Sequence, residues 1–414
     1  MPSVLRSLYI CYLPITEPLV QTQVVAYLAG LAKHGHHIHL LTFETTRMTA
    51  AQKREWRKRL KVQGITWHFL RYHKRPSLPA TIYDVMAGVL AGRRIMRRHR
   101  LNVVHARAHV PAAMGLMLKK QTGCKLIFDI RGLLAEERED QGSWQRDGSP
   151  FRITKALEKR CIDNSDGIVV LTERIRKQLF ESDFDTPLRV IPCCADLNRI
   201  ERQSEKRDAM RAQLGLEDKT VLVYVGKFGG WYREGDMAEF FALARQEWRQ
   251  RDRKLHFLIL TQSDFEIMRN QMVRLGVPES EYSLSQCAPD EIGAYLAAAD
   301  IAISFISASP SKAASSPTKI GEYWAAGLPV ISNPGVGDVD AIIVENKVGI
   351  LVEEFTSEAY RQAIEEITTM MQDETVRERC RQVAQNNFSL DNIGIPFYCS
   401  LYEELAEKIN EVKS

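Results

Sequence analysis

The sequence lacks a long hydrophobic run. No uninterrupted apolar stretch in its 414 residues approaches the roughly 20 residues that span a bilayer. The first residues lead straight into a strand-like pattern and do not resemble a signal sequence, and there is no internal repeat or low-complexity tract. With 45% hydrophobic and 26% charged residues, the composition is that of a soluble globular protein. We therefore expect a cytoplasmic protein without a transmembrane segment.

Cysteines are few and scattered. Of the eight, only Cys193 and Cys194 lie close together, and most of the others are surrounded by apolar residues. Adjacent cysteines make a poor disulfide or zinc pair, so reduced thiols in the core are the expected state.

Acidic residues are scarce in the first quarter of the chain. Residues 1–100 contain 17 Lys and Arg but four Asp and Glu, an excess of 13 positive charges; since the whole chain carries +4, the remainder carries −9. Segments 53–61 and 93–100 read as basic helical faces, which suit an anionic membrane surface. A merely solvated face explains either segment alone, and a nucleic acid would be attracted by the same charge. Because both segments occur in one half and no nucleic-acid motif accompanies them, we expect peripheral contact with an anionic membrane and no nucleic-acid partner.

The chain is long enough for two domains of roughly 200 residues each. Strand-like runs alternate with helical patterns, and such alternation indicates parallel sheets covered on both faces. The strands expected in the first half are 7–12, 37–44, 101–106, 125–130 and 167–172, and the helices are 21–33, 81–99, 111–121 and 151–163. The strands expected in the second half are 220–226, 255–261, 301–305, 330–333 and 349–352. We predict an α/β protein with two doubly wound domains.

The domain junction is expected near residues 190–196, after the last strand of the first sheet. This placement gives a first domain of residues 1–195 and a second domain of residues 196–395. Segment 396–414 contains a further helical pattern, which we expect to cross back onto the first domain.

The most informative stretch is residues 315–331. Ser316 is the expected N-cap and Pro317 the first helical residue, so the amides of Thr318, Lys319 and Ile320 should have no partner within the helix. Free amides at the positive end of a helix dipole attract phosphate, and Lys319 adds a positive charge. An ordinary helix in an α/β protein can show the same start, but seldom with a lysine and a carboxylate on the same helix.

The carboxylate and the end of this helix complete the pattern. Glu322 lies one turn after Lys319, where its oxygens can accept hydrogen bonds from a vicinal diol such as a ribose. Gly327 should end the helix and Pro329 should prevent its return, before a buried strand begins at Val330. The stretch predicts a site for a phosphorylated, hydroxylated ligand.

A second wall of this site is expected at residues 224–233, where a strand runs into a loop with Gly226 and Gly229. Glycines let a backbone approach a pyrophosphate, and Lys227 or Arg233 can balance its charge. An ordinary tight loop is the alternative interpretation.

The candidates in the first half follow expected strands. Arg131 comes directly after strand 125–130 and can hold a phosphate or sugar oxygen, with Asp129 to orient it. Glu137 is a candidate on the acceptor side, although the charged run 136–140 also suits a solvated loop.

Two further candidates lie near strand ends in the first half. Arg107, between His105 and His109, either contacts a ligand or makes structural hydrogen bonds, and two histidines alone imply no metal. Gln21 opens the first helix after the first strand, so it should face the cleft between the domains.

Several of these segments resemble the family 4 glycosyltransferases over nearly the whole chain. The segments that carry the resemblance are residues 12–23, 128–132, 192–196 and 315–331. The resemblance implies the GT-B fold, in which two Rossmann-like domains face a cleft, with an acceptor-side N-terminal domain and a nucleotide-sugar donor in the C-terminal domain. It also implies transfer with retention of configuration, without a bound metal or cofactor.

The sequence departs from the family pattern at three positions. Glu322 matches the second glutamate of the family's Glu-x7-Glu motif, which binds the donor ribose, but the first glutamate is replaced by Ala314. The family usually has an arginine where Lys227 stands and a histidine where Arg131 stands. We therefore expect the backbone amides and Lys319 to do more of the donor binding.

We predict a retaining glycosyltransferase that moves a sugar from a nucleotide-sugar donor to a glycan or polyprenyl-linked acceptor. The expected setting is the assembly of lipopolysaccharide or exopolysaccharide at the inner face of the cell membrane. Lys319, Glu322 and Arg131 are the expected catalytic residues; the expected donor-binding residues are Gly226, Lys227, Gly229, Ser316, Thr318, Lys319, Ile320 and Glu322. Two alternatives remain open: a nucleotide-sugar epimerase of the same fold, and a catalytically degenerate scaffold protein.

Overall fold

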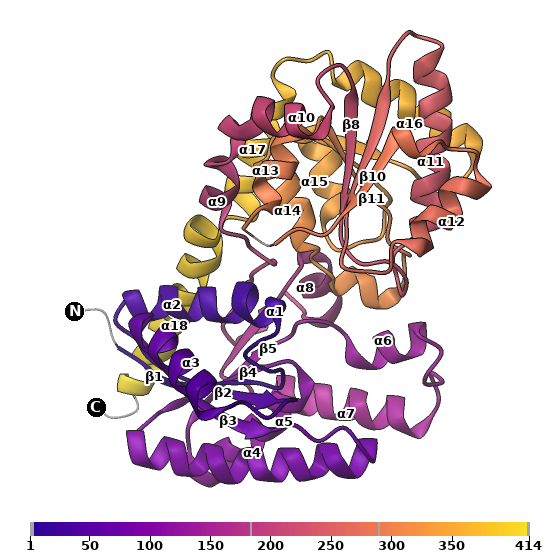
Figure 1. Ribbon diagram of the computed structural model, residues 1–414. Helices are drawn as coiled ribbons and strands as arrows, with labels where there is room; N and C mark the ends of the chain where they lie inside the picture. Colours follow the sequence, from indigo (N-terminus) through magenta and orange to yellow (C-terminus); the bar gives the residue numbers. More distant parts are fainter. Residues whose placement is uncertain (1–3, 183, 289, 412–414) are drawn as a thin grey trace. The chain divides into compact units, whose positions relative to one another are not determined.

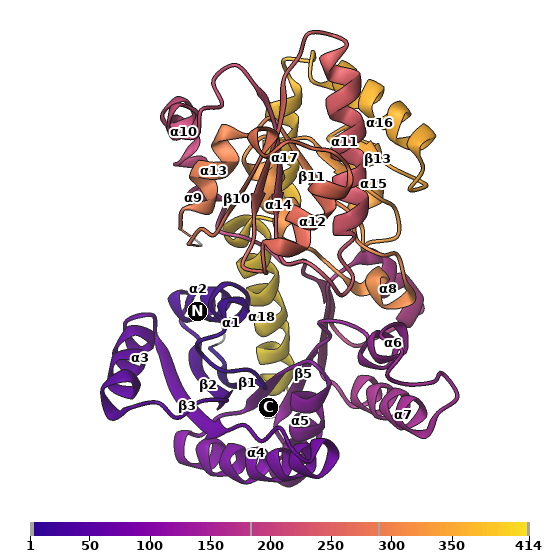
Figure 2. The same ribbon diagram turned by 45° about the vertical axis from the view of Figure 1, so that its right-hand side comes forward.

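The computed structural model describes residues 4–182, 184–288 and 290–411. The chain divides into two compact units, one that ends at Cys193 and resumes at Asp391, and one that spans Cys194–Leu390. The division lies at 193/194 and 390/391, where the sequence suggested 195/196 and 395/396. Each unit is an α/β domain with helices on both faces of its sheet (Figures 1 and 2).

The described part of the first unit contains a seven-stranded parallel sheet in the order β3-β2-β1-β4-β5-β6-β7. The strands are β1 Arg6–Cys11, β2 His37–Glu44, β3 Ile65–Arg71, β4 Val103–Arg107, β5 Lys125–Asp129, β6 Gly167–Val170 and β7 Leu188–Val190. The helices are α1 Pro18–Val20, a π-helical turn Gln21–Val25, α2 Ala26–Lys33, α3 Ala50–Val62, α4 Ser77–His99, α5 His109–Thr122, α6 Leu134–Asp140, α7 Ser149–Asp163, α8 Glu173–Leu179 and α18 Ile395–Glu411.

The second unit contains a six-stranded parallel sheet within the described residues, in the order β10-β9-β8-β11-β12-β13. The strands are β8 Thr220–Val225, β9 Leu255–Leu260, β10 Tyr282–Ser285, β11 Ile301–Ser304, β12 Val330–Ser332 and β13 Gly349–Leu351. The helices are α9 Leu197–Glu201, α10 Arg207–Leu214, α11 Glu234–Arg249, α12 Glu266–Arg274, α13 Ile292–Ala298, α14 Thr318–Ala325, α15 Val339–Asn346, α16 Ser357–Met370 and α17 Val376–Asn387, with a 3-10 segment at Pro310–Ala314.

Both faces of the second sheet are buried. Alternate residues of β8 enter different hydrophobic clusters, Val221 and Val223 on one face and Leu222 and Tyr224 on the other. A parallel strand with helices on both sides reads as a continuous apolar run, and this pattern is what made the strands visible in the sequence. The prediction of two doubly wound domains is confirmed.

The C-terminal helix α18 completes the first unit. It contacts α2 and β7, and Leu401 and Leu405 lie against the position where Gly167 would carry a Cβ. The hydroxyls of Tyr398 and Tyr402 reach the sheet at Asp129 and Ser7, 3.1 Å and 3.4 Å away. The end of the chain is therefore part of the core of the first unit.

The structure corrects two local expectations. The first helical segment begins at Pro18 and passes through a π-helical turn at Gln21–Val25 before α2, where the sequence suggested one helix from residue 21. The charged run 136–140 is not a loop but lies in helix α6. Of the helices in the described residues, none combines the length and the apolar character needed to cross a membrane.

Candidate functional site

Helix α14 begins one residue later than expected. Pro317 is at the N-cap position and Thr318 is the first helical residue, so the predicted cap by Ser316 is wrong. The amide of Ile320 donates to the Pro317 carbonyl at 3.1 Å and is not available to a ligand, which corrects its predicted role. In the chain that the structure describes, no partner is found for the amides of Thr318 and Lys319. These two amides remain at the positive end of the helix.

The end of α14 matches the sequence. Gly327 has a left-handed φ of +75°, its amide donates to the Trp324 carbonyl at 2.8 Å, and the Leu328 amide donates to the Tyr323 carbonyl at 3.0 Å. This pair of bonds is the Schellman motif that glycine favours.

Buried side chains fix α14 to the sheet. The Tyr323 hydroxyl accepts a hydrogen bond from the Val225 amide at 2.7 Å, at the end of β8. The Trp324 indole donates to the Val348 carbonyl at 3.0 Å. The start of α14 is therefore held beside the carboxyl end of β8.

Lys319 is buried between aromatic rings. Its side chain is 9% exposed, and Nζ lies 4.4 Å and 4.1 Å from the ring centroids of Tyr224 and Tyr232. Burial lowers the pKa of Lys319 to about 7, although the charge of Glu322 acts in the opposite direction. Gly226 has a φ of +155°, which favours glycine, and a Cβ there would also collide with Nζ. Among the described residues, Lys319 is thus a buried amine without a carboxylate within ion-pair distance.

The amides of the two candidate glycines are already engaged. The Gly226 amide donates to the Leu260 carbonyl at 2.9 Å, and the Gly229 amide donates to the Glu234 carboxylate at 3.2 Å. Lys227 is exposed. The loop therefore presents an exposed lysine, and its two candidate glycine amides are not available to a phosphate.

The end of this loop is tied to its surroundings. Arg233 forms an ion pair with Asp236 at 2.7 Å, and its guanidinium lies 3.9 Å from the centroid of the Phe355 ring. These contacts give Arg233 a structural role in this unit. Lys312, which sequence reasoning did not select, is buried with Nζ 3.5 Å from the centroid of the Trp231 ring. A second lysine therefore packs on the same loop as Lys319.

Glu322 has a partner that sequence reasoning missed. Arg199 of α9 forms an ion pair with Glu322 at 3.2 Å, and burial raises the pKa of Glu322. The Asp196 side chain caps α9 by accepting from the Arg199 amide at 3.2 Å. The cap is visible in the sequence, but the contact joins residues 123 positions apart. The arginine orients the carboxylate that was expected to meet a diol.

Ala314, at the position of the missing motif glutamate, is 2% exposed at the end of the 3-10 segment. A glutamate could not be accommodated there without movement of the loop, because the alanine Cβ is already enclosed.

In the first unit, Asp129 is the centre of a buried polar cluster at the end of β5. Its Oδ2 accepts from the hydroxyls of Tyr9 and Tyr398 at 3.3 Å and 3.1 Å. The guanidinium groups of Arg107 and Arg131 lie 3.8 Å and 3.6 Å from its oxygens. One carboxylate therefore lies between two arginines.

Gln23 connects the same two arginines. Arg131 donates to its side-chain oxygen at 3.4 Å and to the Cys193 sulfur at 3.3 Å, whereas Arg107 reaches its backbone carbonyl at 3.5 Å. Gln23 lies in the π-helical turn and is 2% exposed, and no sequence pattern indicates this contact. The expectation that Asp129 orients Arg131 is consistent with this geometry.

The histidines beside Arg107 make internal contacts. His105 is fully buried, and its Nδ1 lies 3.0 Å from the Tyr402 hydroxyl; His109 pairs with Glu158 at 2.8 Å.

In helix α6, Glu136 is buried against Lys155 at 2.8 Å, and Glu137 is half-buried. The carboxylate of Glu137 fills the space where Gly132 lacks a side chain.

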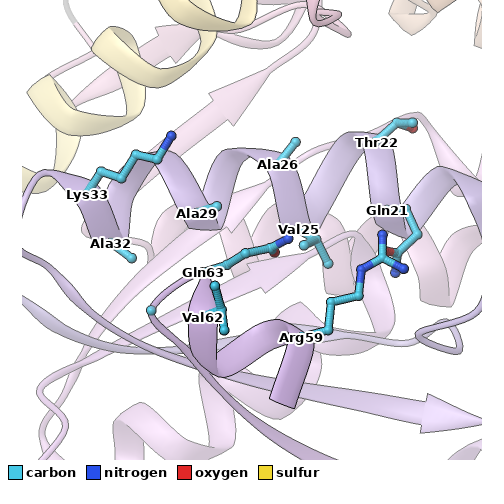
Figure 3. A pocket seen from close by; sticks show the side chains of 11 residues that line it. Gln21, Thr22, Val25, Ala26, Ala29, Ala32, Lys33, Arg59, Val62 and Gln63 are labelled. Atoms are coloured by element: carbon cyan, nitrogen blue, oxygen red, sulfur yellow. The ribbon is translucent and has the colours of Figure 1, made fainter. Parts of the chain in front are cut away.

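Gln21 lies at one end of a surface groove in the first unit (Figure 3). The groove has a volume of about 550 Å³, with apolar side chains of α2 along one wall and the end of α3 along the other. Arg59 lies beside Gln21, and Lys33 lies at the far end. The Gln21 side chain itself donates through Nε2 to the Ile15 carbonyl at 2.6 Å.

Solved structures share this two-domain architecture. Sucrose-phosphate synthase from Thermosynechococcus elongatus superposes with a TM-score of 0.72 at 16% identity, over 97% of this chain and 99% of that one. HepE from Anabaena in complex with UDP and glucose has a TM-score of 0.67 at 14% identity, over 98% and 99% of the two chains. The glycosyltransferase WaaG, involved in lipopolysaccharide biosynthesis, has a TM-score of 0.63 at 17% identity, over 97% and 99%. The two parallel-sheet units are therefore those of a GT-B protein.

The sequence comparisons identify the family. The model for Glycosyltransferase Family 4 matches residues 20–199, and the model for Glycosyl transferases group 1 matches residues 219–370. The chain belongs to the family 4 glycosyltransferases. It is also similar to alpha-monoglucosyldiacylglycerol synthase from Streptococcus pneumoniae, with 22% identity over 383 residues, 89% of this chain and 80% of that protein.

Proposed function

We propose that this glycosyltransferase transfers a sugar from a nucleotide-sugar donor to a lipid-linked or glycan acceptor, with retention of anomeric configuration, in the assembly of a cell-surface polysaccharide. The observation that carries the proposal is Lys319, a buried amine at the start of α14 that has no close anionic partner within residues 4–182, 184–288 and 290–411. A diphosphate would supply the missing negative charge.

The donor side is assigned to the second unit. The amides of Thr318 and Lys319 bind phosphate oxygens, and the Lys319 ammonium neutralises the charge. Glu322, oriented by Arg199, accepts hydrogen bonds from the ribose diol. Lys227 and Gly229 stay predictions, with Lys227 as the exposed cation at the rim. HepE, solved with UDP and with UDP-glucose, supports a nucleotide-sugar donor.

In the proposed reaction the protein positions the donor and the acceptor and stabilises the negative charge of the leaving group. The bond between the anomeric carbon and the phosphate oxygen breaks, and its electron pair leaves with the nucleoside diphosphate. The acceptor hydroxyl attacks the same face of the sugar, and its proton passes to the departing phosphate. Lys319 and the helix amides stabilise the charge that develops on the leaving group, which is commonly the largest catalytic contribution.

The first unit is assigned to the acceptor. Arg131 stays our candidate to hold a phosphate or sugar oxygen with its planar set of donors, while Arg107 and Glu137 stay candidates beside it. Gln21 marks the end of a groove with an apolar wall and cationic ends at Arg59 and Lys33. Such a groove suits an amphipathic acceptor with an anionic group, and the similarity to a glucosyldiacylglycerol synthase supports a lipid.

Helix α4 carries the features of a membrane-contact surface. Leu78, Ile82, Met86 and Leu90 repeat every four residues and are 45–69% exposed. Residues of this spacing share one helix face, and four arginines lie between positions 93 and 98, within two turns of the stripe. An apolar stripe beside cations matches the interface of an anionic bilayer.

The membrane contact is tested by flotation with liposomes. We expect the protein to float with liposomes that contain anionic lipid and the double variant Ile82→Glu, Leu90→Glu to remain in the dense fraction. A matched charge change on an exposed position of the second unit, Val273→Glu, should not affect flotation. Equal recovery with neutral and anionic liposomes contradicts this part of the proposal.

The function is tested by a panel of nucleotide sugars. Thermal-shift measurements first identify the donor, because a ligand that binds the native state raises the melting temperature. The protein and the donor are then incubated with membrane extract, the product is identified by mass spectrometry, and its anomeric configuration is determined by NMR. A glycosylated lipid whose new anomeric centre has the configuration of the donor supports the proposal. Conversion of the donor without acceptor indicates an epimerase, and binding without transfer indicates a scaffold.

A further inference from the structure

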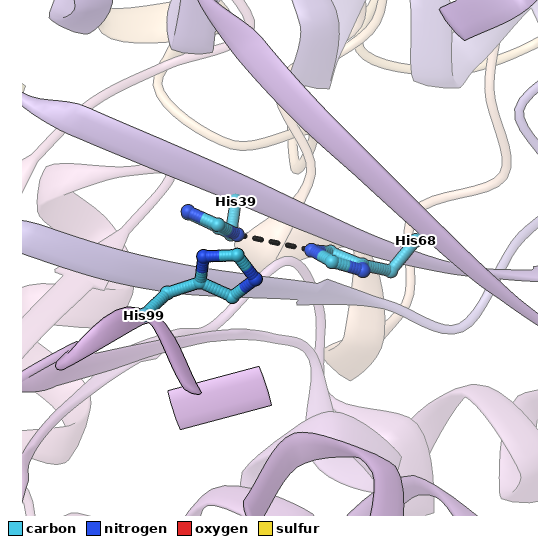
Figure 4. Close-up of side chains that lie close together, drawn as sticks. All are labelled: His39, His68 and His99. Atoms are coloured by element: carbon cyan, nitrogen blue, oxygen red, sulfur yellow. Dashed lines mark hydrogen bonds between the residues drawn. The ribbon is translucent and has the colours of Figure 1, made fainter. Parts of the chain in front are cut away.

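Three histidines from separate elements meet in the first unit (Figure 4). His39 lies on β2, His68 on β3, and His99 is the last residue of α4. The register pairs His39 with Thr66, so His68, two residues further along β3, points to the same face of the sheet. Helix α4 runs from the end of β3 back toward the start of β4, which brings His99 over that face.

The imidazole nitrogens are close enough to share one ion. Each histidine offers one ring nitrogen such that all three atoms lie within 4.8 Å of one another. His39 Nδ1 and His68 Nε2 are 2.9 Å apart, and Figure 4 shows the His99 ring facing this pair. A tetrahedral zinc with bonds of about 2.0–2.1 Å places two ligand nitrogens about 3.3 Å apart. If the rings of His39 and His68 move slightly apart and the side chain of the half-buried His99 rotates, the three nitrogens reach that geometry.

The surroundings decide which ion fits. Besides the histidines themselves, the charged side chains near the pair are cations, Arg6 near His39 and Arg57 and Arg98 near His68. Such surroundings disfavour a hard cation that is held by charge alone, such as Mg²⁺ or Ca²⁺. Neutral imidazoles favour a borderline transition metal, whose bonds to nitrogen offset the repulsion.

We propose that His39, His68 and His99 form a Zn²⁺ site, with three protein nitrogens and a fourth position left to water. This site is separate from the proposed sugar-transfer site, since His39 and His99 lie toward the amino ends of the strands and Arg107 and Arg131 at the carboxyl ends. The ion joins β2 and β3 to the end of α4, the helix with the exposed apolar stripe. It stabilises the position of that helix and takes no part in sugar transfer.

The site is tested with untagged full-length protein from which metals have been removed by a chelator. Isothermal titration with Zn²⁺ alone should give one ion per chain, and the melting temperature should rise with added Zn²⁺. The ligand variants are His99→Ala and His68→Gln, which change half-buried side chains and spare the buried His39. The matched control is His37→Ala, an exposed histidine on β2 outside the triad.

Each outcome has a clear meaning. We expect both ligand variants to bind Zn²⁺ at least tenfold more weakly and to lose the Zn²⁺-dependent rise in melting temperature, while the control behaves as wild type. Their melting temperatures without metal report whether they fold. Absence of binding to the wild type at about 100 µM Zn²⁺, or equal affinity in a folded His99→Ala variant, overturns the proposal. In that case the histidines form a neutral hydrogen-bonded pair beside a third ring.

Discussion

The sheets of the two units differ in the charge that is buried at their carboxyl ends: a carboxylate in the first unit and an amine in the second. At the end of β5 in the first unit, Asp129 is fully buried but receives two tyrosine hydroxyls and lies beside Arg107 and Arg131. Beside the end of β8 in the second unit, Lys319 is also buried, but its Nζ donates to the Tyr224 hydroxyl at 3.4 Å and lies over the rings of Tyr224 and Tyr232, and its pKa is lowered to about 7.

The difference indicates different tasks. A buried carboxylate among several donors and cations contributes to the rigidity of a unit. A buried amine without a close anion is unfavourable until an anion binds, so its capacity to bind one remains available. Both units have a doubly wound fold, and they differ in how many polar partners surround the buried charge.

The largest expected effect comes from Lys319→Met. If Lys319 neutralises the leaving diphosphate, kcat/KM should fall about 100- to 1000-fold, as for the loss of one oxyanion donor. The melting temperature should stay equal or rise, because an apolar side chain replaces a poorly solvated amine. Lys254→Met is the control, since Lys254 is a largely exposed surface lysine of the same unit. Activity within threefold of wild type would mean that Lys319 is not a donor contact.

Asp129→Asn should act on stability instead. Removal of the carboxylate leaves two buried arginines without their shared anion, and the free energy of unfolding should fall by about 3 kcal/mol. Denaturant unfolding followed by fluorescence measures this change. Asp163→Asn, on the surface of the same unit, is the control. An unchanged midpoint of unfolding would show that Asp129 is not the centre of a structural cluster.

The Arg199–Glu322 pair should affect donor binding. Glu322→Gln keeps the shape but removes the charge, and the donor KM should rise about tenfold. Arg199→Met removes the partner that orients Glu322, so it should act through the same step. The double variant should then lose less free energy of donor binding than the two single variants lose together, and the difference, the coupling energy, should be about 1 kcal/mol. Additive effects in this double-mutant cycle would contradict a shared role.

The smallest effect is a pH dependence of donor affinity. Below pH 7 Lys319 is protonated in the free protein, and the affinity should be constant. Above pH 7 a proton must be taken up when the diphosphate binds, so a nucleotide sugar should bind about tenfold more weakly at pH 8 than at pH 6. The nucleotide sugar is the suitable probe because its diphosphate has no free terminal phosphate to titrate near pH 6. A flat profile for the wild type, or the same slope in Lys319→Arg, would assign the titration to another group.

Much of the fold could be predicted because its signals are local. The apolar runs of parallel strands are continuous, and the predicted strand 37–44 coincides with β2. The partly exposed strands β3 and β10 were missed, since mixed burial breaks the apolar pattern. The cap at Ser316 was wrong by one residue, because either residue of a Ser-Pro pair can precede the first turn.

The sequence by itself determined the architecture, the end of helix α14 before Gly327, and the presence of a lysine and a carboxylate on this helix. Only the tertiary structure decided what surrounds them: Tyr224 lies 95 positions from Lys319, and Arg199 lies 123 positions from Glu322. The same holds for the three histidines, which come from two strands and a helix end. Periodicity reports which face of an element is buried, whereas the partner across that face depends on sheet order and helix packing. The pKa values and the ligand geometry arise from those partners.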